Sequence, residues 1–143
     1  MSQDNFKLAG RVAIVTGCNT GLGEGMALAL AQAGADIVGV NVSAPDDTGV
    51  QIEAMGRRFL DLRANLADVS GIDALIAQAL VLSGSIDILV NNAGIIRRED
   101  AINFTEKDWD DVMDLNLKSG FFFSQAVARQ FMAQGTGGKI INV

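Results

Sequence analysis

Short apolar runs alternate with helical segments along the chain, and this alternation constrains the fold more than any other feature. Two of the runs, at 11–16 (RVAIVT) and 86–91 (IDILVN), are almost continuously apolar, as expected of strands covered on both faces. In residues 71–83, by contrast, the apolar residues recur at the i, i+3, i+4, i+7 spacing of a helix that buries one face. Further runs of strand character are DIVGV at 36–40, FLDLRA at 59–64 and KIINV at 139–143. The predicted order is therefore β-α-β-α-β-α-β-α-β.

Connections of this length join parallel strands, and right-handed crossovers then produce an open sheet with helices on both faces. We therefore predict an α/β fold: a doubly wound parallel sheet with Rossmann-type dinucleotide-binding topology, cut after the fifth strand. The run at 59–64 alternates apolar and charged residues, which places it nearer a sheet edge. Residues 1–143 are interpreted as the N-terminal dinucleotide-binding portion of a single domain.

The predicted helices also carry start and stop signals. Ser70 with Asp73, and Thr105 with Asp108, have the spacing of capping pairs at helix starts. Glycines follow four helical segments, where a left-handed residue is expected to end a helix: Gly34, Gly56, Gly84 and Gly135.

A glycine-rich loop, TGCNTGLGEG at 16–25, connects the first predicted strand to the first helix. Gly17 permits a tight turn, Gly21 lets the backbone approach a pyrophosphate, and Gly23 lets helix and strand pack closely. The start of the helix then offers free N–H groups and a partial positive charge to an anion. The spacing alone is a weak signal, and a plain tight turn is the alternative interpretation. Its place at the first crossover of the sheet favours a phosphate-binding loop.

The end of the second predicted strand bears on which dinucleotide is bound. An acidic residue there binds the adenosine ribose, and a nearby Arg favours a 2′-phosphate. This chain has Asn41, which can hydrogen-bond ribose hydroxyls without repelling a phosphate. Since no Arg or Lys occurs in 16–25 or 36–48, the sequence favours NAD over NADP.

The composition excludes several classes of function. A net charge of −6 disfavours nucleic-acid partners, because such a surface repels phosphate backbones. With no His and one Cys, a zinc or iron site is not expected. The apolar stretches are shorter than a membrane span, and the first ten residues lack the apolar core of a signal peptide. We therefore expect a cytoplasmic protein with neither a metal nor a membrane partner.

Three motifs together resemble the short-chain dehydrogenase/reductase family: T-G-x-x-x-G-x-G at 16–23, NNAG at 91–94, and Asn116 in the fourth predicted helix. The segments at 94–119 and 137–143 resemble, more narrowly, its bacterial sugar-acid members. These are of the 2-deoxy-D-gluconate 3-dehydrogenase and 2-dehydro-3-deoxy-D-gluconate 5-dehydrogenase type, which act in the breakdown of pectin-derived uronates. The resemblance implies hydride transfer between a nicotinamide dinucleotide and a secondary alcohol or ketone of a sugar acid, in a homodimer or homotetramer.

The resemblance also implies roles for individual residues at the cofactor. The pyrophosphate and the adenosine ribose would be wrapped by Gly17, Asn19, Thr20, Gly21, Leu22 and Gly23. Asn65 and Leu66 would contact the adenine, although the family usually has Asp where this chain has Asn65. The nicotinamide side would be lined by Asn92, Ala93 and Gly94, with Asn91 steadying the sheet.

Asn116 also stands out by its spacing. It shares a helical stripe with Trp109, Val112, Met113 and Gly120, which we expect to face inward. An unpaired amide buried there would cost roughly 1–3 kcal/mol, so Asn116 needs partners. The resemblance implies that it holds a water in the proton relay to a catalytic Lys. The alternative is a satisfied core amide that braces a strand.

Arg97 and Arg98 follow the NNAG motif in a loop at the carboxyl end of a strand, where such sheets place their substrates. An Arg could bind the carboxylate of a sugar acid with two parallel hydrogen bonds. The alternative is a surface cluster in which both pair with Glu99 and Asp100.

Two further features each have two interpretations. Cys18, in the glycine-rich loop, is either a low-pKa thiol at a helix start or a small filler residue. Of the three phenylalanines at 121–123, at least one must face away from the core of this domain. That exposed face is either a subunit interface, since the resemblance implies association through the fourth and fifth helices, or a surface that packs under a segment that this chain lacks.

In the family, a catalytic Ser follows the last strand seen here, and a Tyr and a Lys in Y-x-x-x-K follow further on. This chain contains no Tyr. We expect those residues to come after KIINV in a complete protein, and the 143 residues alone to be catalytically inactive. The alternatives are a non-catalytic dinucleotide-binding module and an inactive fragment of marginal stability.

Overall fold

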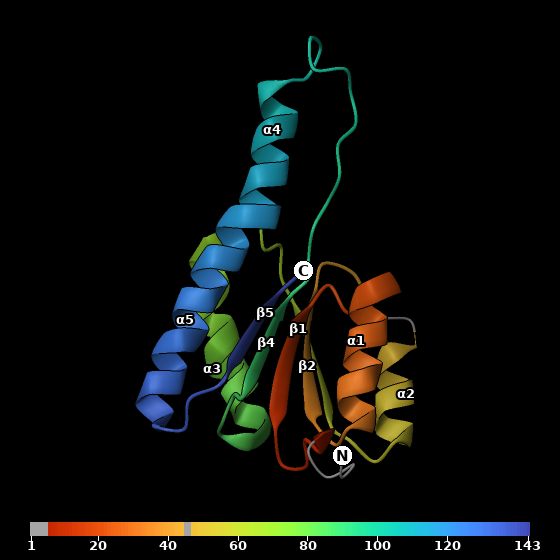
Figure 1. Ribbon diagram of the computed structural model, residues 1–143, viewed down its shortest axis with the longest axis vertical. Coiled ribbons are helices and arrows are strands. Elements are labelled where there is room, and N and C mark those ends of the chain that lie inside the picture. The colour runs from red at the N-terminus through yellow and green to blue at the C-terminus, as the bar shows by residue number, and fades with distance from the viewer. Residues whose placement is uncertain (1–5, 45–46) are drawn as a thin grey trace.

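A parallel sheet of five strands, in the order β3-β2-β1-β4-β5, forms the centre of the structure (Figure 1). The computed structural model describes residues 6–44 and 47–143. The strands are β1 Val12–Thr16, β2 Asp36–Asn41, β3 Phe59–Arg63, β4 Ile88–Asn91 and β5 Lys139–Asn142. The helices are α1 Gly21–Gln32, α2 Thr48–Ala54, α3 Ile72–Ser83, α4 Glu106–Met113 and α5 Ser119–Gln134, with a 3₁₀ turn η2 Val69–Gly71 and a π-helical turn η3 Asp114–Lys118.

The strand order places a change of direction at the middle of the sheet. The chain begins in β1, moves outward through β2 to β3 at one edge, and then returns to β4 on the other side of β1. Open parallel sheets bind ligands at such a point, outside the carboxyl ends of the strands. The predicted doubly wound α/β fold with Rossmann-type topology is confirmed, and so is the edge position of β3.

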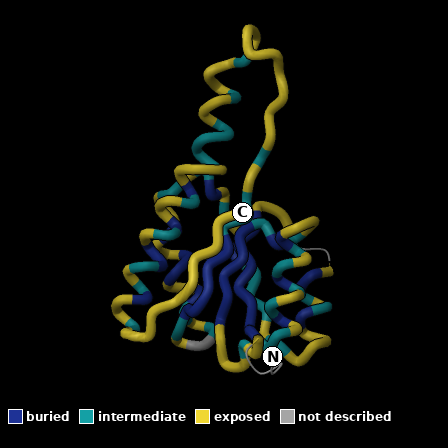
Figure 2. The backbone as a smooth tube through the Cα atoms, in the orientation of Figure 1, coloured by how far each residue is buried: buried dark blue, intermediate teal, exposed yellow. Residues whose placement is uncertain are grey.

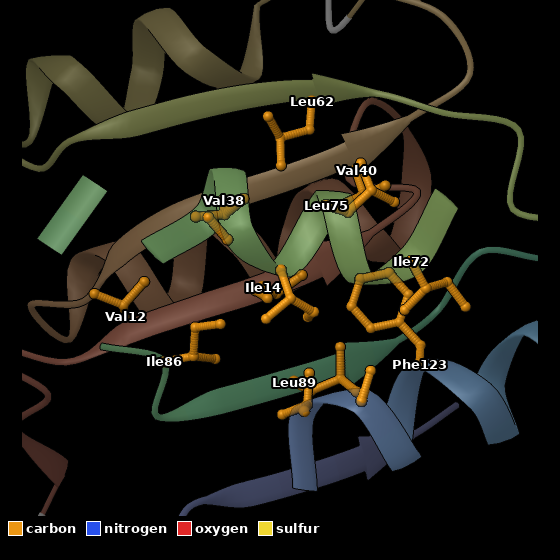
Figure 3. Packing of buried hydrophobic residues seen from close by; sticks show 14 of the residues in the cluster. Val12, Ile14, Val38, Val40, Leu62, Ile72, Leu75, Ile86, Leu89 and Phe123 are labelled. Atoms are coloured by element: carbon orange, nitrogen blue, oxygen red, sulfur yellow. The ribbon is translucent and has the colours of Figure 1, made fainter. Parts of the chain in front are cut away.

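Two hydrophobic layers hold the helices against the two faces of the sheet. The layer under α3 and α5 contains Ile14, Leu89 and Phe123 (Figure 3). The layer under α1 and α2 contains Val15 and Ile52. Because successive residues of β1 enter opposite layers, the whole strand is buried, which explains its continuous apolar sequence (Figure 2).

The ends of the helices follow the predictions with one exception. The Thr105 hydroxyl accepts a hydrogen bond from the Asp108 N–H at 3.0 Å, which confirms the predicted cap of α4. The predicted cap at Ser70 is wrong, because Asp68 accepts a hydrogen bond from the Ser70 N–H at 2.9 Å and the chain passes through η2 before α3 begins. Positive φ angles occur as predicted at the glycines that follow helical segments: Gly34, Gly56, Gly84 and Gly135.

The fourth helical segment is continuous through α4, η3 and α5, and α4 rises beyond the carboxyl ends of the strands (Figure 1). No sheet lies beside α4 at that height, so Trp109 is 58% exposed and Asn116 is also exposed. The prediction that both side chains face inward is therefore wrong. Within the described residues, no helix combines the length and apolar character that a bilayer crossing requires.

The three consecutive phenylalanines divide between the core and the surface. Phe123 is 1% exposed and packs between its own helix α5 and the sheet, whereas Phe121 and Phe122 are 62% and 39% exposed. The prediction that at least one of them faces away from the core is confirmed. The two outer rings contact each other edge to face, with centroids 5.2 Å apart.

Candidate functional site

The segments that follow β1, β2, β3 and β4 converge on one pocket at the switch point of the sheet. The pocket has a volume of about 230 Å³. Predicted site residues in its lining are Gly17, Asn19, Asn41, Leu66, Ala93 and Gly94. The rest of the lining comes from Val40, Val42, Ser43, Ala64, Ile95 and Leu115. The fold thus brings together the predicted segments that follow four different strands.

The glycine-rich loop after β1 has a backbone that requires glycine. Gly17 and Gly21 have φ angles of +65° and +59°. A Cβ on Gly23 would lie 2.0 Å from the Gly17 carbonyl oxygen, so α1 begins in direct contact with the end of the loop. A Cβ on Gly21 would meet no atom within 4 Å, so the backbone there is open to a ligand.

The start of α1 adds a second feature that fits an anion. The Thr20 side chain does not cap the helix, so it leaves the first N–H groups of α1 available. An uncapped helix start beside exposed glycine backbone is a favourable place for a phosphate group. These observations fit the pyrophosphate of a dinucleotide.

Three side chains hold the loop from beneath. The Cys18 N–H donates to Asn41 Oδ1 at 2.8 Å, and the Thr48 hydroxyl donates to the Cys18 carbonyl at 3.1 Å. Asn92 Nδ2 donates to the carbonyls of Thr16 and Gly17 at 3.1 and 3.0 Å. The loop is therefore held in place by the protein itself, which reduces the ordering that ligand binding would need.

The Asn41 side chain binds the glycine-rich loop instead of pointing into the pocket. It is 2% exposed, and its Nδ2 donates to Asp61 Oδ1 at 3.1 Å and to Cys18 Sγ at 3.5 Å. This differs from the prediction that the amide faces a ribose. Val42 and Ser43 are the exposed residues that directly follow β2, and Ser43 Oγ accepts a hydrogen bond from Asn19 Nδ2 at 2.7 Å.

Thr16 positions two predicted site residues, although it was not itself predicted as one. Its side chain is buried at the end of β1, where the hydroxyl accepts hydrogen bonds from the N–H groups of Asn92 and Ala93 at 3.0 and 2.9 Å. The hydroxyl donates to the Val90 carbonyl at 3.4 Å. The available sequence signal was a single hydroxyl residue closing an otherwise aliphatic strand.

Other predicted residues lie beside the pocket without lining it. Asn65 Oδ1 accepts a hydrogen bond from the Ala67 N–H at 3.1 Å and so forms the turn after β3. The Leu22 side chain, in the first turn of α1, is 75% exposed. The predicted residues outside the lining are Thr20, Gly21, Leu22, Gly23, Asn65 and Asn92.

Asn116 lies at a second, smaller pocket of about 80 Å³, which shares Ala93, Gly94 and Leu115 with the first. Its Oδ1 accepts a hydrogen bond from the Ile95 N–H, and its Nδ2 donates to the Ile95 carbonyl, both at 2.8 Å. The sequence predicted a buried amide, whereas the structure has an exposed amide with both groups paired. The amide joins η3 to the loop after β4. Asn91 similarly donates to Ser124 Oγ and Asn142 Oδ1, both at 2.9 Å, and joins β4 to α5 and β5.

Arg97 pairs with α4 instead of with its neighbours in sequence. Its Nε lies 3.5 Å from Asp108 Oδ1 and its Nη2 lies 3.6 Å from Asp111 Oδ2. For Arg97, these ion pairs replace the predicted pairing with Glu99 and Asp100. Neither Arg97 nor Arg98 lines the two pockets described above.

Cys18 is buried within the loop. Burial raises the pKa of its thiol, and this effect outweighs the hydrogen bond from Asn41, which acts in the opposite direction. The alternative of a low-pKa thiol is therefore wrong, and the role of a small filler residue is confirmed. Residues 6–44 and 47–143 contain no group of three or more His, Cys, Asp and Glu side chains placed to hold a metal ion.

Comparison with known proteins identifies what this arrangement is similar to. The family described as "short chain dehydrogenase" matches residues 11–143. The 2-dehydro-3-deoxy-D-gluconate 5-dehydrogenase of Escherichia coli (strain K12) is 64% identical over 138 residues, an alignment that covers 96% of this chain and 54% of that protein. The chain thus spans about half the length of this relative.

Two solved structures agree in fold and contain dinucleotides. One is a candidate 2-deoxy-D-gluconate 3-dehydrogenase from Agrobacterium tumefaciens with bound NADP, which superposes with a TM-score of 0.85 at 46% identity over 96% of this chain and 54% of that one. The other is a short chain dehydrogenase from Mycobacterium paratuberculosis bound to NAD, with a TM-score of 0.89 at 29% identity over 95% and 56% of the two chains. The predicted family is confirmed, and the 64% identity agrees with the resemblance to its sugar-acid members.

Proposed function

The chain belongs to the short-chain dehydrogenase family, and on this premise we propose that it forms the dinucleotide-binding part of an NAD-dependent sugar-acid oxidoreductase. The observation that carries this proposal is the pocket at the switch point, with the glycine-rich loop on one side and the segment after β4 on the other. The two solved neighbours hold NADP and NAD, which supports a nicotinamide dinucleotide as the ligand.

Each segment around the pocket has a proposed part in binding. The backbone at Gly21 and the start of α1 would hold the pyrophosphate, because both are open and carry free N–H groups. Leu66 would contact the adenine with its apolar side chain. Ala93 and Gly94 lie where the two pockets meet and would border the nicotinamide. When bound, the nicotinamide ring supplies or accepts the hydride.

Asn116 is proposed as a positioning residue. Its two hydrogen bonds to Ile95 fix the loop that follows Gly94, so the wall of the nicotinamide side depends on it. A π-helical turn is rare, and such turns often occur at functional sites. The water in a proton relay, which the family resemblance implies, would lie beside this amide.

For the substrate, we propose the carboxylate of a sugar acid bound near the loop after β4. The 64% identity to a 2-dehydro-3-deoxy-D-gluconate 5-dehydrogenase supports this class. Arg98 is the stronger candidate for the carboxylate contact, because Arg97 is already paired with Asp108 and Asp111. We also propose that the complete protein is a homo-oligomer and that it is located in the cytoplasm.

The same proposal assigns the proton-transfer step to residues outside this chain. The family uses a Ser, a Tyr and a Lys, and the chain contains no Tyr. We therefore propose that the 143 residues bind the dinucleotide without turning over a substrate. The second candidate, a binding module without catalysis, rests on the same observation.

Titration with NADH tests the proposed function. We expect a saturable change in NADH fluorescence and a rise in melting temperature with the purified chain. Oxidation of NADH with 2-dehydro-3-deoxy-D-gluconate-type ketones should occur with the full-length relative and not with this chain. A folded chain that NADH neither binds nor stabilises would overturn the proposal, and turnover by the chain alone would refute the assignment of catalysis to residues elsewhere.

A further inference from the structure

We propose that the ion pair between Asp61 and Arg63 makes this site select NAD over NADP, and that Arg63 becomes a contact for the 2′-phosphate when Asp61 is removed. The inference rests on the proposed function, since it assumes that a dinucleotide occupies the pocket after β1. It concerns two residues of β3, outside the segments 16–25 and 36–48 that contain no Arg or Lys.

The sheet brings Arg63 beside the end of β2. In the parallel pairing of β2 with β3, Arg63 lies opposite Asn41, the position from which such folds contact the adenosine ribose. Ala64, the next residue, donates its N–H to the Asn41 carbonyl at 3.1 Å and lines the pocket. A cation 22 residues beyond Asn41 in sequence is therefore its neighbour in space.

Asp61 holds that cation through an ion pair. Arg63 Nε lies 2.5 Å from Asp61 Oδ2, and Asp61 Oδ1 accepts a hydrogen bond from Asn41 Nδ2 at 3.1 Å. Asn41 in turn binds the Cys18 N–H of the glycine-rich loop at 2.8 Å. A chain of polar contacts thus runs from the phosphate loop to Arg63, with Asp61 at its centre.

The charges in this chain of contacts oppose a 2′-phosphate. Asp61 neutralises Arg63 and adds a carboxylate close to the ribose position, so a phosphate would have to compete with it for the guanidinium. The arginines before β3 cannot substitute, because Arg57 and Arg58 lie at the amino ends of β2 and β3, opposite the pocket, and pair with Asp36. A ribose with a free 2′-hydroxyl meets no such repulsion.

Both side chains remain accessible to a ligand. The Arg63 side chain is 45% exposed and that of Asp61 is 25% exposed. Loss of the Asp61 charge would leave Arg63 available for a charge-assisted hydrogen bond, which contributes enough to change affinity by roughly tenfold or more. Asparagine at 61 would keep an oxygen for the bond from Asn41, so the loop should stay in place.

The test compares matched ligand pairs on the purified chain by calorimetric titration. The pairs are NAD with NADP, and 5′-AMP with 2′,5′-ADP, which differ by the 2′-phosphate alone. The variants are Asp61→Asn, Arg63→Gln, the double variant, and Arg129→Gln as a control at an exposed arginine on α5. Melting curves establish that each variant is folded.

We expect the wild-type chain and Arg129→Gln to prefer NAD. Asp61→Asn should tighten NADP and 2′,5′-ADP by about tenfold while NAD and 5′-AMP change by less than about twofold. The double variant should lose that gain, and Arg63→Gln alone should leave NAD binding unchanged. An unaltered NAD-to-NADP ratio in Asp61→Asn, or a gain that persists in the double variant, would overturn the inference. A folded wild-type chain that binds neither NAD nor 5′-AMP would instead overturn the proposed function, and the inference with it.

Discussion

Gly23 and Gly25 lie in the same turn of α1 but meet different surroundings. A Cβ at Gly23 would collide with the Gly17 carbonyl at 2.0 Å, whereas a Cβ at Gly25 would meet no atom within 4 Å. We expect Gly23→Ala to displace the glycine-rich loop and weaken NADH binding roughly tenfold or more. Gly25→Ala should retain binding and raise the free energy of unfolding by about 0.5–1 kcal/mol, because alanine favours a helix. Fluorescence titration and urea unfolding measure the two effects, and equal NADH affinity in both variants would contradict the role of close packing at Gly23.

Cys18 supplies a second prediction at the scale of one side chain. Burial raises the pKa of its thiol, with smaller contributions from the nearby Asp61 and Glu24 carboxylates, and the thiolate is the form that reacts. We expect iodoacetamide to alkylate Cys18 at least about tenfold more slowly in the folded chain than in guanidinium chloride. Mass spectrometry over time gives both rates. Rapid alkylation of the folded chain would mean that the loop opens and exposes the sulfur.

At the scale of elements, an ion pair between Asp36 and Arg58 joins the amino-terminal ends of β2 and β3. Burial disfavours the charged form of Asp36, but hydrogen bonds from the backbone and side chain of Arg58 outweigh this and hold the pKa of that carboxyl below its usual range. The Arg58 N–H donates to Asp36 Oδ1 at 2.9 Å, and Arg58 Nη2 donates to Asp36 Oδ2 at 2.7 Å. The pair therefore contributes to stability only while Asp36 is ionised.

We expect Asp36→Asn to lower the free energy of unfolding by about 1–2 kcal/mol at neutral pH, since the partner Arg58 is half exposed. The wild-type advantage should be complete above the ordinary Asp pKa of about 3.9 and should disappear as the pH falls through the lower folded-state pKa. Urea unfolding across acidic pH measures this difference. Glu53→Gln, at an exposed position on α2, is the control with the same change of charge. A wild-type advantage that persisted below the folded-state pKa would show that packing, not charge, is responsible.

The elements also separate what the sequence could predict from what it could not. The strands were predictable because β1 and β4 are buried on both faces, and their apolar runs express that burial directly. The stripe from Trp109 to Asn116 was misjudged, since periodicity identifies a face but not what lies opposite it. Here α4 extends past the sheet, and the π-helical turn η3 alters the phase before α5. Asn116 consequently meets the backbone of Ile95 rather than the core.

For the molecule as a whole, strand order decided which sequence segments form the site. The phosphate loop and the NNAG segment were predictable, because β1 and β4 end at the same switch point. The Asp61–Arg63 pair was not predictable, because it lies far from Asn41 in sequence and becomes its neighbour only through the pairing of β2 with β3. The direction of the Asn41 side chain could not be predicted either. It turns toward Cys18 and Asp61 because both offer hydrogen-bond partners.

At the scale of the whole molecule, exposed apolar surface predicts that copies of the chain associate. Phe121 and Phe122 border an apolar groove of about 420 Å³ together with Met113 and Leu117, and such exposed apolar patches are typical of interaction sites. The outermost strand β5 is a second candidate, because Ile141 is 44% exposed at an open sheet edge.

One charged substitution in each surface shows which of the two forms the interface. If copies of the chain associate through the groove, Phe121→Glu should reduce the mass measured by sedimentation equilibrium to that of one chain, because burying an unpaired carboxylate between subunits is costly. Ile141→Lys should leave that mass unchanged, although a lysine at the edge would prevent strand-to-strand pairing. The reverse result would move the interface to β5. A monomer in the wild-type chain at every concentration would refute association of this chain through either surface.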